Sequence, residues 1–488
     1  MNYIPNTQFT GASILLSNEC NLACAYCYNL DDSRYDGQPS FMSTDMAEKC
    51  IDFLIQGALV VKEKQNNAGI NLMLFGGEPT MNAKVIKDMI EYGCIMCEKA
   101  GLSFKAQLIT NCTIWNDDIE DMLNSWLSLT GMVDIQLSID GCPEVIDHNR
   151  KSKDSSTSTS VKILETAKKY IEWRDKNGID PKSIHVHGCI SKFSLPLAKR
   201  SYDYIRDIIG FDRIWFMPIH EDTWDDEDIN ILEEQYKMIA DRIYTECIDK
   251  KTSKYLDDFS SFEVDVPKGN LPCGAGTNFL TFDTDGTIYP CHKFKYPKEK
   301  KMVLGHIDKG IDPEVLSEFE GVTMKNFFGV NNCDDCPNKN CKICMAQNYD
   351  YNGDIRQGFP KYCQLALKED EIRWELRRRL IEANLVTGGV KSEILDLSIM
   401  DKLDENIEPT NSFDDLIKNY LKNSLEEYTI LLDKDLVKFK DIIVNDTKYH
   451  QEVINNNMSM LNSIITDLVG LVSKISEDIN KIKDKNND

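Results

Sequence analysis

The sequence predicts an α/β protein whose core is a partial TIM-type barrel of six strand–helix units, (βα)6, followed by a small cysteine-rich domain and a C-terminal helical extension. Three observations support this fold class. Apolar, β-branched runs alternate with helical stretches over about the first 220 residues, which is typical of a parallel sheet. From about residue 270 the strands shorten and cysteines multiply. Beyond about residue 366 the chain becomes a series of charged amphipathic segments.

The apolar runs are expected to form the strands of one parallel sheet. Helices between them include residues 44–58, with Ser43 as N-cap, and residues 82–100. Because a closed barrel of this type has eight strands, six predict a partial barrel. The runs are residues 12–17, 70–75, 103–110, 132–139, 183–190 and 213–219.

Chemically distinctive motifs follow the first four expected strands. A cysteine triplet (residues 20–27) follows the first strand and FGGEPT (75–80) the second. TNC (110–112) ends the third, and SIDG (138–141) ends the fourth. In βα barrels the carboxyl ends of the strands carry the active site. We therefore expect these motifs to meet at one rim.

The same patterns give the expected domain boundaries. The extension is expected to pack on its own domain or to form a dimer seam, which would make the protein a homo-oligomer through its C-terminal helices. The expected parts are a barrel over residues 1–235, a helical bridge over 236–270, a cysteine-rich domain over 271–366 and the helical extension over 367–488.

Charge and hydropathy exclude two classes of partner. The formal net charge is -24, so there is no basic excess to bind a phosphate backbone, and nucleic acid is not an expected ligand. The first residues lack a signal-peptide pattern, and no stretch approaches about 18 uninterrupted apolar residues, so no membrane association is expected. The expected location is cytoplasmic.

Seventeen cysteines in such a compartment favour metal ligation over a disulfide framework. Cys20, Cys24 and Cys27 form a C-x3-C-x2-C pattern in one short segment. A closed zinc site would need a fourth ligand that this segment does not supply. Three thiolates on a four-iron cluster would instead leave one iron open to a substrate or cofactor.

The triplet, with Tyr26 before its third cysteine and FGGEPT after the next strand, resembles the signature of the radical S-adenosylmethionine (radical SAM) enzymes. The resemblance spans roughly residues 10 to 220 and implies a [4Fe-4S] cluster whose open iron is chelated by SAM. An electron from the cluster, supplied by a flavodoxin or ferredoxin-type donor, would cleave SAM to a 5'-deoxyadenosyl radical that abstracts hydrogen from substrate.

The resemblance also implies the residues that contact SAM. The two glycines would let the backbone approach the SAM amino group, Glu78 would accept from its ammonium, and Pro79 would stiffen the turn. The alternative is that GGEP is only a turn and that the triplet is a chance cluster. The implied SAM contacts are Tyr26, Gly76, Gly77, Glu78, Pro79, Asn111 and Ser138.

A second set of cysteines resembles the SPASM domain, which carries auxiliary iron–sulfur clusters in peptide-modifying radical SAM enzymes. The resemblance implies two auxiliary [4Fe-4S] clusters, the first with an open iron that would bind a substrate thiolate or serve only as an electron relay. A zinc ribbon is the alternative. The implied ligands are Cys273, Cys291 and Cys344 for the first cluster, and Cys333, Cys336, Cys341 and Cys363 for the second.

The remaining cysteines divide by position. Cys50, Cys94, Cys97 and Cys247 fall on expected helices and are interpreted as packing residues. Three others lie at strand ends, where a thiol would either donate a hydrogen atom to a substrate radical or simply pack. These candidates are Cys112, Cys142 and Cys189.

Four histidines lie near the expected rim or the second domain. His185, His187 and His220, on or after the last two barrel strands, are interpreted as core or rim groups. His292 follows Cys291, where the anaerobic sulfatase-maturating enzymes of this family have an Asp thought to act as base. His292 is therefore a candidate catalytic residue, and this departure disfavours formylglycine formation.

The segments CGAGTNFLTFDTDGTIYPCHKF and CMAQNYDYNGDI resemble radical SAM maturases of ribosomally synthesised peptides. The activity this implies is a thioether crosslink, from sulfur to carbon, in a Cys-rich precursor peptide. The alternatives are formylglycine formation, peptide epimerisation and, in another class, a non-catalytic multi-cluster electron carrier. Leader binding by the acidic helical extension is an alternative to its structural role.

Overall fold

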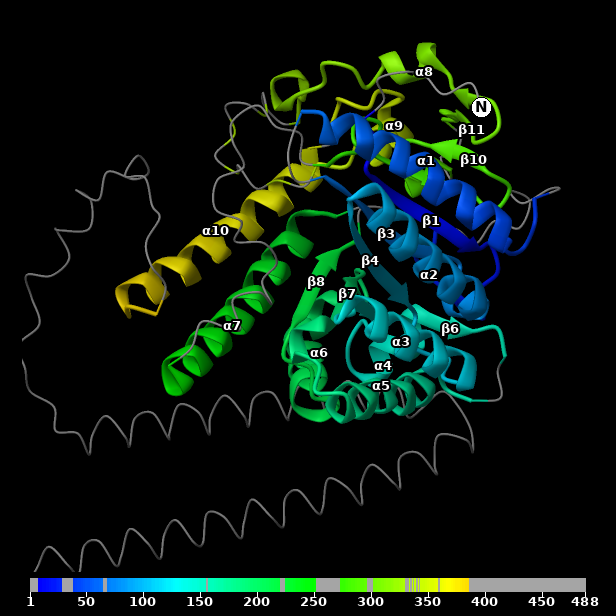
Figure 1. The fold of residues 1–488 in the computed structure, drawn as a ribbon. Helices are drawn as coiled ribbons and strands as arrows, with labels where there is room; N and C mark the ends of the chain where they lie inside the picture. The colour runs from blue at the N-terminus through cyan, green and yellow to red at the C-terminus, as the bar shows by residue number, and fades with distance from the viewer. Residues whose placement is uncertain are drawn as a thin grey trace, which may run out of the picture. The chain divides into compact units, whose positions relative to one another are not determined.

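The computed structural model describes a folded unit that contains the six expected barrel strands and most of the cysteine-rich segment (Figure 1). Its elements are given below with their bounds. The described residues are 8–28, 38–64, 68–154, 157–219, 224–251, 273–295, 302–329, 333, 336, 338, 341, 343–358 and 360–385.

A parallel sheet forms the centre of the fold, and its six strands are those expected from the sequence. They lie side by side in chain order and pair in parallel, so the prediction of a partial (βα)6 barrel is confirmed. The strands are β1 (Gly11–Ser17), β3 (Gly69–Gly76), β4 (Ser103–Thr110), β5 (Ile135–Ser138), β7 (Ile184–Ile190) and β8 (Ile214–Pro218).

Helices connect these strands and cover the sheet (Figure 1). The expected N-cap is confirmed, because the Ser43 hydroxyl accepts a hydrogen bond from the Met46 N–H at 3.2 Å. The connecting helices are α1 (Thr44–Lys62), η2 (Pro79–Asn82), α2 (Ala83–Ala100), α3 (Asp117–Thr130), α4 (Pro143–Asn149), α5 (Thr159–Lys176), η3 (Pro181–Ser183), η4 (Leu195–Leu197), α6 (Ala198–Asp203) and η5 (Tyr204–Ile209).

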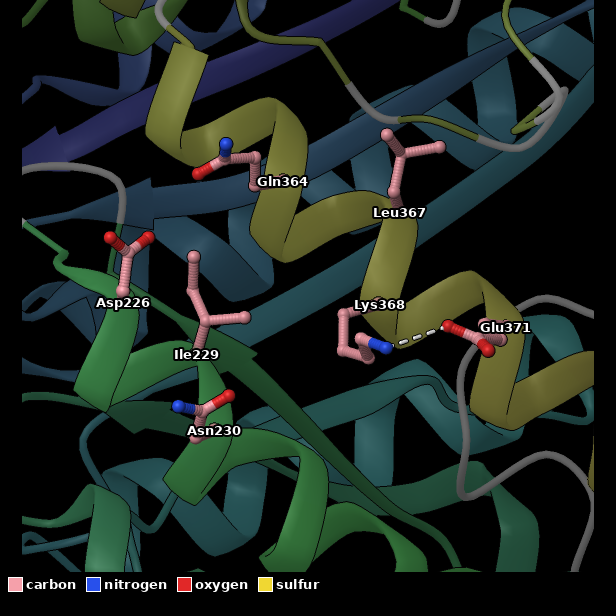
Figure 2. Close-up of a pocket in the computed structure, with 7 residues that line it drawn as sticks. All are labelled: Asp226, Ile229, Asn230, Gln364, Leu367, Lys368 and Glu371. Carbon is pink, nitrogen blue, oxygen red and sulfur yellow. Dashed lines mark hydrogen bonds and ion pairs between the residues drawn. The ribbon is translucent and has the colours of Figure 1, made fainter.

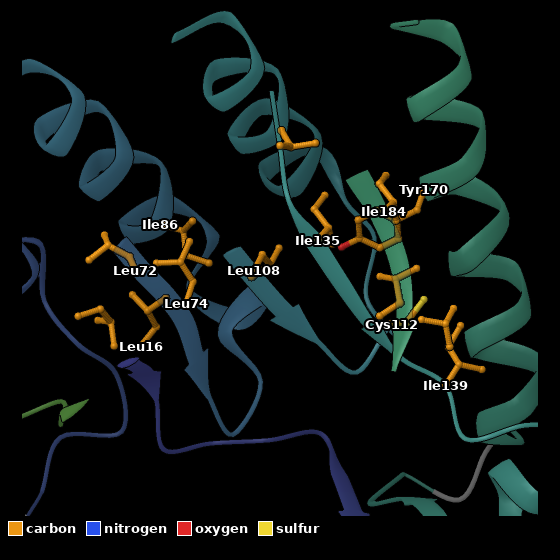
Figure 3. Close-up of a cluster of buried hydrophobic side chains, with 14 of the residues drawn as sticks. Leu16, Leu72, Leu74, Ile86, Leu108, Cys112, Ile135, Ile139, Tyr170 and Ile184 are labelled. Carbon is orange, nitrogen blue, oxygen red and sulfur yellow. The ribbon is translucent and has the colours of Figure 1, made fainter. Parts of the chain in front are cut away.

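The main core lies between the sheet and these helices. Figure 3 shows aliphatic side chains of β3, β4, β5 and β7 packed against Ile86 of α2 and Tyr170 of α5. Both of these residues are fully buried. Continuous burial along β1 is expected for a parallel strand that has structure on both faces.

The cysteine-rich segment continues the barrel sheet, a connection that the sequence did not indicate. Its first strand, β9 (Phe279–Phe282), pairs in parallel with β1, with Gly11 opposite Phe279. β10 (Thr287–Tyr289), β11 (Gly305–His306) and β12 (Gly310–Ile311) then add in antiparallel order. Helices η7 (His292–Lys295), α8 (Pro313–Ser317), η8 (Met324–Asn326) and α9 (Met345–Asn352) complete this segment.

Two long helices lie side by side at the edge of the unit, α7 (Asp226–Lys250) and α10 (Pro360–Glu382). A pocket of about 370 Å³ lies between them. Figure 2 shows residues that line it, among them Ile229 of α7 and Leu367 of α10, and the ion pair of Lys368 with Glu371. α10 covers the start of the expected helical extension. The later amphipathic segments of the expected extension, residues 425–443 and 460–483, lie outside the described residues. Residues 252–270 of the expected bridge also lie outside them.

No helix in the described ranges combines sufficient length with sufficient hydropathy for a transmembrane span.

Candidate active site

The cysteine triplet lies on the loop that leaves the carboxyl end of β1. Its middle member, Cys24, ends the short strand β2 (Leu22–Cys24), which pairs antiparallel with β6 (Arg150–Ser152). Cys27 then turns back, donating its N–H to the Cys24 carbonyl at 3.0 Å. The three thiols are half-buried on one short loop, as the spacing predicts.

Burial and neighbouring polar groups have opposite effects on the pKa values of these thiols. Burial raises the pKa of Cys20 to about 11 and that of Cys24 to about 12. Two hydrogen-bond donors oppose this rise in the pKa of Cys20: the Leu22 N–H, 3.4 Å from the Cys20 Sγ, and the Asn111 Nδ2, 3.7 Å from it. The positive charge of Arg150 favours the thiolate of Cys24. These partners stabilise negative charge on sulfur.

Gly76 and Gly77 allow the chain after β3 to lie directly against the cysteine loop. Gly76 has φ +140°, and a Cβ there would lie 2.4 Å from the Ser17 carbonyl oxygen. A Cβ on Gly77 would lie 2.2 Å from the Glu19 carbonyl oxygen. The Gly77 N–H donates to Ser17 O at 2.6 Å. The glycines therefore have a steric role within the protein itself.

Glu78 is a fully buried junction between three segments. Its Oε1 accepts from the Thr80 N–H at 3.1 Å, the Thr80 hydroxyl at 2.6 Å and the Thr110 hydroxyl at 2.7 Å. Its Oε2 accepts from the Asn111 N–H at 2.7 Å. Burial raises the pKa of Glu78, and the bonds from Thr80, Asn111 and Thr110 oppose that shift. Pro79 follows, buried, as the first residue of η2.

Asn111 joins the third strand to the cysteine loop. Besides its contact with Cys20, its Nδ2 donates to Asn21 Oδ1 at 2.9 Å. Ser138 ends β5, lies opposite His187 of β7 and is half-buried. The expected SAM contacts from β3, β4 and β5 thus all lie at carboxyl ends of neighbouring strands.

Asp140 and Arg150 were not singled out from the sequence. Asp140 Oδ1 accepts from an Arg150 guanidinium nitrogen at 2.8 Å and from the Cys189 N–H at 2.9 Å. Its Oδ2 accepts from the Tyr26 hydroxyl at 2.7 Å, and the Arg150 guanidinium lies 5.6 Å from the Tyr26 ring centre. The SIDG motif at a strand end was the available signal for Asp140. Nothing in the local pattern identified Arg150 as its partner.

The three candidate hydrogen-atom donors have different surroundings. Cys112 is fully buried in the main core, with its thiol 3.9 Å from the Ile163 carbonyl of α5 (Figure 3). Cys142 is 1% exposed and contacts Ser201 of α6 at 3.6 Å. Only Cys189 of these three is half-buried and bonded to the Asp140 junction. The burial of Cys112 and Cys142 indicates packing roles.

The cysteines of the second set fall into two groups. Burial raises the pKa of Cys291 to about 12, and the next contributions come from Cys344 and Cys273. Burial likewise raises the pKa of Cys333 to about 11, and the nearby thiols of Cys363 and Cys336 raise it further. Burial also raises the pKa of Cys341, and Cys363, Cys336 and Cys333 add to that shift. In the described part of the chain, no three Cys, His, Asp or Glu side chains meet closely enough to hold a single metal ion.

His292, in η7, lies against residues that flank the main site. Its ring centre is 4.7 Å from that of Phe75, which precedes Gly76, and 6.1 Å from that of Tyr28, which follows Cys27. Burial lowers the pKa of His292 to about 3, so the ring is neutral at pH 7. Of the other histidines, His185 is buried at 3% exposure, and His220 lies outside the described residues.

Comparison with known proteins identifies the fold that carries this site. Residues 14–173 match the radical SAM superfamily. The chain contains a radical SAM domain. The prediction of a radical SAM enzyme is therefore confirmed.

The radical SAM domain has curated and structural relatives. The cysteine-type anaerobic sulfatase-maturating enzyme of Clostridium novyi is 22% identical over 67% of this chain and 83% of its own length. The serine-type enzyme of Bacteroides thetaiotaomicron is 24% identical over 67% and 77%. The sporulation killing factor maturation protein SkfB of Bacillus subtilis is 26% identical over 34% of each chain.

A solved structure of anSMEcpe with bound AdoMet matches the fold with a TM-score of 0.57 at 19% identity, over 77% of this chain and 99% of that chain. The superfamily match includes the cysteine loop, Glu78, Asn111 and the Asp140–Arg150 pair. It ends before Cys189 and the second set of cysteines. The matched segment therefore spans the three loop cysteines and all seven of the expected SAM contacts.

Proposed function

We propose that this enzyme is a radical SAM peptide maturase that forms a thioether crosslink in a ribosomally synthesised precursor peptide. The observation that carries the proposal is the arrangement of Cys20, Cys24 and Cys27 on one loop, held by Asn111 and by the turn at Gly76 and Gly77, within the segment that matches the superfamily. Three thiols with one site left open suit a [4Fe-4S] cluster that also binds a cofactor.

The donor set fits such a cluster. Each member is a thiol, the ligand that iron–sulfur clusters take. The Leu22 backbone N–H and the Asn111 side-chain amide donate to the Cys20 sulfur, and Arg150 favours the thiolate of Cys24. Such outer contacts orient the ligands and set the electron affinity of the centre. These three cysteines would hold the cluster, which with SAM bound would supply reductive cleavage of the sulfonium and so a radical able to abstract hydrogen from the peptide.

The residues around the loop are proposed to bind and orient SAM. Glu78 has four protein donors on its carboxylate, so its main contribution is to fix the turn and the end of β4. Ser138 and Asn111 lie on the neighbouring strand ends. The proposed SAM contacts remain Tyr26, Gly76, Gly77, Glu78, Pro79, Asn111 and Ser138.

The second set is proposed to hold two auxiliary [4Fe-4S] clusters in a SPASM domain over residues 271–366. Support comes from the electrostatic grouping of Cys291 with Cys273 and Cys344, and of Cys333 with Cys336, Cys341 and Cys363. The first group has three thiols, which would leave an open iron. That iron would bind a substrate thiolate or act as an electron relay.

The substrate is proposed to be a Cys-rich precursor peptide. A maturation protein of a sporulation killing factor is among the relatives, which supports a peptide substrate. Formylglycine formation is the second candidate, because two sulfatase-maturating enzymes match over 67% of the chain. The residue after Cys291 is His292, not the Asp thought to act as the base in those enzymes, and this departure favours the thioether reaction over formylglycine formation.

The remaining partners follow from this chemistry. We propose a flavodoxin or ferredoxin-type electron donor, a cytoplasmic location and self-association through the C-terminal extension, residues 367–488. Peptide epimerisation would require a thiol beside the substrate, and of Cys112, Cys142 and Cys189 the last has the most suitable position.

Anaerobic reconstitution with iron and sulfide tests the proposal. With SAM and dithionite, the protein should release 5'-deoxyadenosine, and Cys24→Ala should abolish that release while the packing variant Cys50→Ala retains it. With a Cys-rich peptide encoded beside the gene, loss of two hydrogens indicates a crosslink. An aldehyde product would indicate formylglycine instead, and an unchanged mass with altered chirality would indicate epimerisation. A wild-type protein that releases no nucleoside would refute the proposal.

A further inference from the structure

The short helix η7, which begins one residue after Cys291, contacts both flanks of the cysteine loop. At its end, Lys295 reaches Asn18, two residues before Cys20, with Nζ 2.7 Å from Asn18 Oδ1. At its start, His292 stacks on Tyr28, one residue after Cys27. The Lys293 Nζ lies 5.6 Å from the centre of the same Tyr28 ring.

The contact at Asn18 depends on a fully buried ion pair. Lys295 and Asp283 are both 0% exposed, and the lysine Nζ lies 2.8 Å from Oδ1 and 2.7 Å from Oδ2 of the carboxylate. Asp283 starts the turn between β9 and β10, and its Oδ1 also accepts from the Thr284 N–H at 2.7 Å. The charge of Lys295 is therefore neutralised within the hairpin that leads to Cys291.

The Asn18 side chain has few alternatives to its present orientation. Its Oδ1 accepts from Lys295, and its Nδ2 donates to the Thr284 hydroxyl at 2.8 Å and the Pro39 carbonyl at 3.1 Å. Its backbone N–H donates to the Ser40 carbonyl at 2.8 Å. Two of its three side-chain partners lie on the β9–β10 hairpin or η7. The start of the cysteine loop is thus fixed to the segment that carries Cys291.

A buried ion pair adds little stability over well-packed apolar residues, so a role in specifying geometry accounts better for this pair than a stabilising role. We propose that η7, through Lys295 with Asn18 and through His292 with Tyr28, is a positioning clamp that sets the cluster-binding loop relative to Cys291. Lys295, Asp283 and Asn18 are positioning residues of this clamp. The inference rests on the proposed function, because it assigns the loop and Cys291 to two cofactor sites whose separation the clamp determines.

The clamp has a chemical consequence for each site. Movement of Asn18 shifts the backbone that precedes Cys20, the same backbone that accepts from the Gly77 and Glu78 N–H groups. Movement of Tyr28 shifts the residue after Cys27. A loosened clamp would therefore change both the ligand geometry of the loop and the SAM site beside it.

Asn18→Ala is the main test, because it removes the link and leaves the buried Lys295–Asp283 pair intact. Lys295→Met removes the link and the charge. Arg206→Met is the matched control, since Arg206 is a buried cation paired with Glu246 at 2.9 Å on η5 and α7, away from the loop. All three are compared with wild type in the full-length, reconstituted protein.

We expect Asn18→Ala to weaken SAM binding by roughly tenfold and to alter the SAM-induced change in the electron paramagnetic resonance spectrum of the reduced cluster. Arg206→Met should lower only the melting temperature. In the cluster-free protein, hydrogen exchange of residues 18–28 should rise in Asn18→Ala and stay at the wild-type level in Arg206→Met.

The clamp is refuted if Asn18→Ala matches wild type in SAM affinity, spectrum and exchange, or differs only as Arg206→Met does. Lys295→Met serves as a second variant and should reproduce the Asn18→Ala spectrum if it folds. Failure of the proposed function would look different, since wild type itself would then release no 5'-deoxyadenosine, while the exchange comparison would still test the clamp.

Discussion

Asn111 donates its side-chain amide to the sulfur of Cys20 at 3.7 Å while its backbone N–H donates to the buried carboxylate of Glu78. One residue at the end of β4 thereby contacts both the cysteine loop and the turn after β3. Donation to a thiolate sulfur stabilises its negative charge, and in an iron–sulfur centre this raises the reduction potential.

Asn111→Ala should therefore lower the midpoint potential of the cluster. Because Asn111 is also a proposed SAM contact, the substitution should reduce the rate of 5'-deoxyadenosine release by roughly tenfold. Potentiometric titration followed by electron paramagnetic resonance measures the first effect, and liquid chromatography measures the second. Asn177→Ala is the control, because the Asn177 side chain donates to the Trp173 carbonyl at the end of α5, away from the cysteine loop. An unchanged potential in Asn111→Ala would contradict this role.

Glu78→Gln should destabilise the fold as well as the SAM site. The amide replaces one acceptor oxygen with a donor, so either the Asn111 N–H or the Thr80 and Thr110 donors lose their partner in a fully buried site. Leaving one buried donor unsatisfied costs about 2 kcal/mol. Urea denaturation of the cluster-free protein measures this loss. Glu120→Gln, in the first turn of α3, should stay within about 0.5 kcal/mol of wild type, because the Glu120 side chain is 40% exposed and pairs with Lys176 at the surface.

Much of this site could be predicted from sequence because its determinants are local. The strand ends, the cysteine spacing and the glycines at 76 and 77 are all readable within short windows, and Gly76 does adopt a positive φ. The partial barrel followed from apolar runs that coincide with β1, β3, β4, β5, β7 and β8.

The parts that could not be predicted depend on contacts between residues distant in the chain. Asn18 and Lys295 are separated by 277 positions, and neither lies in a recognised motif. The pairing of β9 with β1 likewise joins Gly11 to Phe279. The sequence placed Cys112 and Cys189 alike at strand ends and did not distinguish them. In the structure the Cys112 thiol lies in the core and Cys189 is half-buried, a difference that depends on the direction of each side chain.

Asp140→Asn should show how much the buried ion pair with Arg150 contributes to the free energy of unfolding. The substitution leaves the guanidinium, 7% exposed, without a counterion. The single amide oxygen can accept from the Cys189 N–H or from the Tyr26 hydroxyl, whereas the carboxylate accepts from both. Removing one partner of such a pair costs about 3 kcal/mol. Asp203→Asn is the comparison, since its partner Arg242 is more exposed and also pairs with Asp207 and Glu246. Equal losses for the two variants would argue against a special role for Asp140.

Cys112→Ala and Cys189→Ala should separate packing from chemistry. Cys112 is fully buried among aliphatic side chains, so truncation should lower the free energy of unfolding by about 1 kcal/mol and leave 5'-deoxyadenosine release unchanged. Cys189 is half-buried, so its truncation should cost less. If the reaction uses a thiol as hydrogen donor, peptide product should fall in Cys189→Ala alone. A loss of product in Cys112→Ala with wild-type SAM cleavage would contradict the packing assignment.

Asp370 on α10 should give the protein a pH-dependent stability. Burial raises its pKa to about 6, against the opposing effects of Arg373 and Trp374. Because the pKa is higher in the folded state, the folded protein binds more protons than the unfolded chain between about pH 4 and pH 6. The free energy of unfolding should therefore fall as the pH rises through that range, and the loss should persist at neutral pH.

Asp370→Asn should remove this slope and stabilise the protein at pH 7 by up to about 3 kcal/mol, since one pKa unit corresponds to about 1.4 kcal/mol. Urea denaturation at pH 4, 5, 6 and 7 measures the slope. Glu371→Gln, whose carboxylate is exposed beside Lys368, should retain the wild-type slope. If Asp370→Asn and wild type follow parallel curves over this range, the carboxyl is not the group responsible. The pH dependence of the free energy of unfolding would then come from another residue.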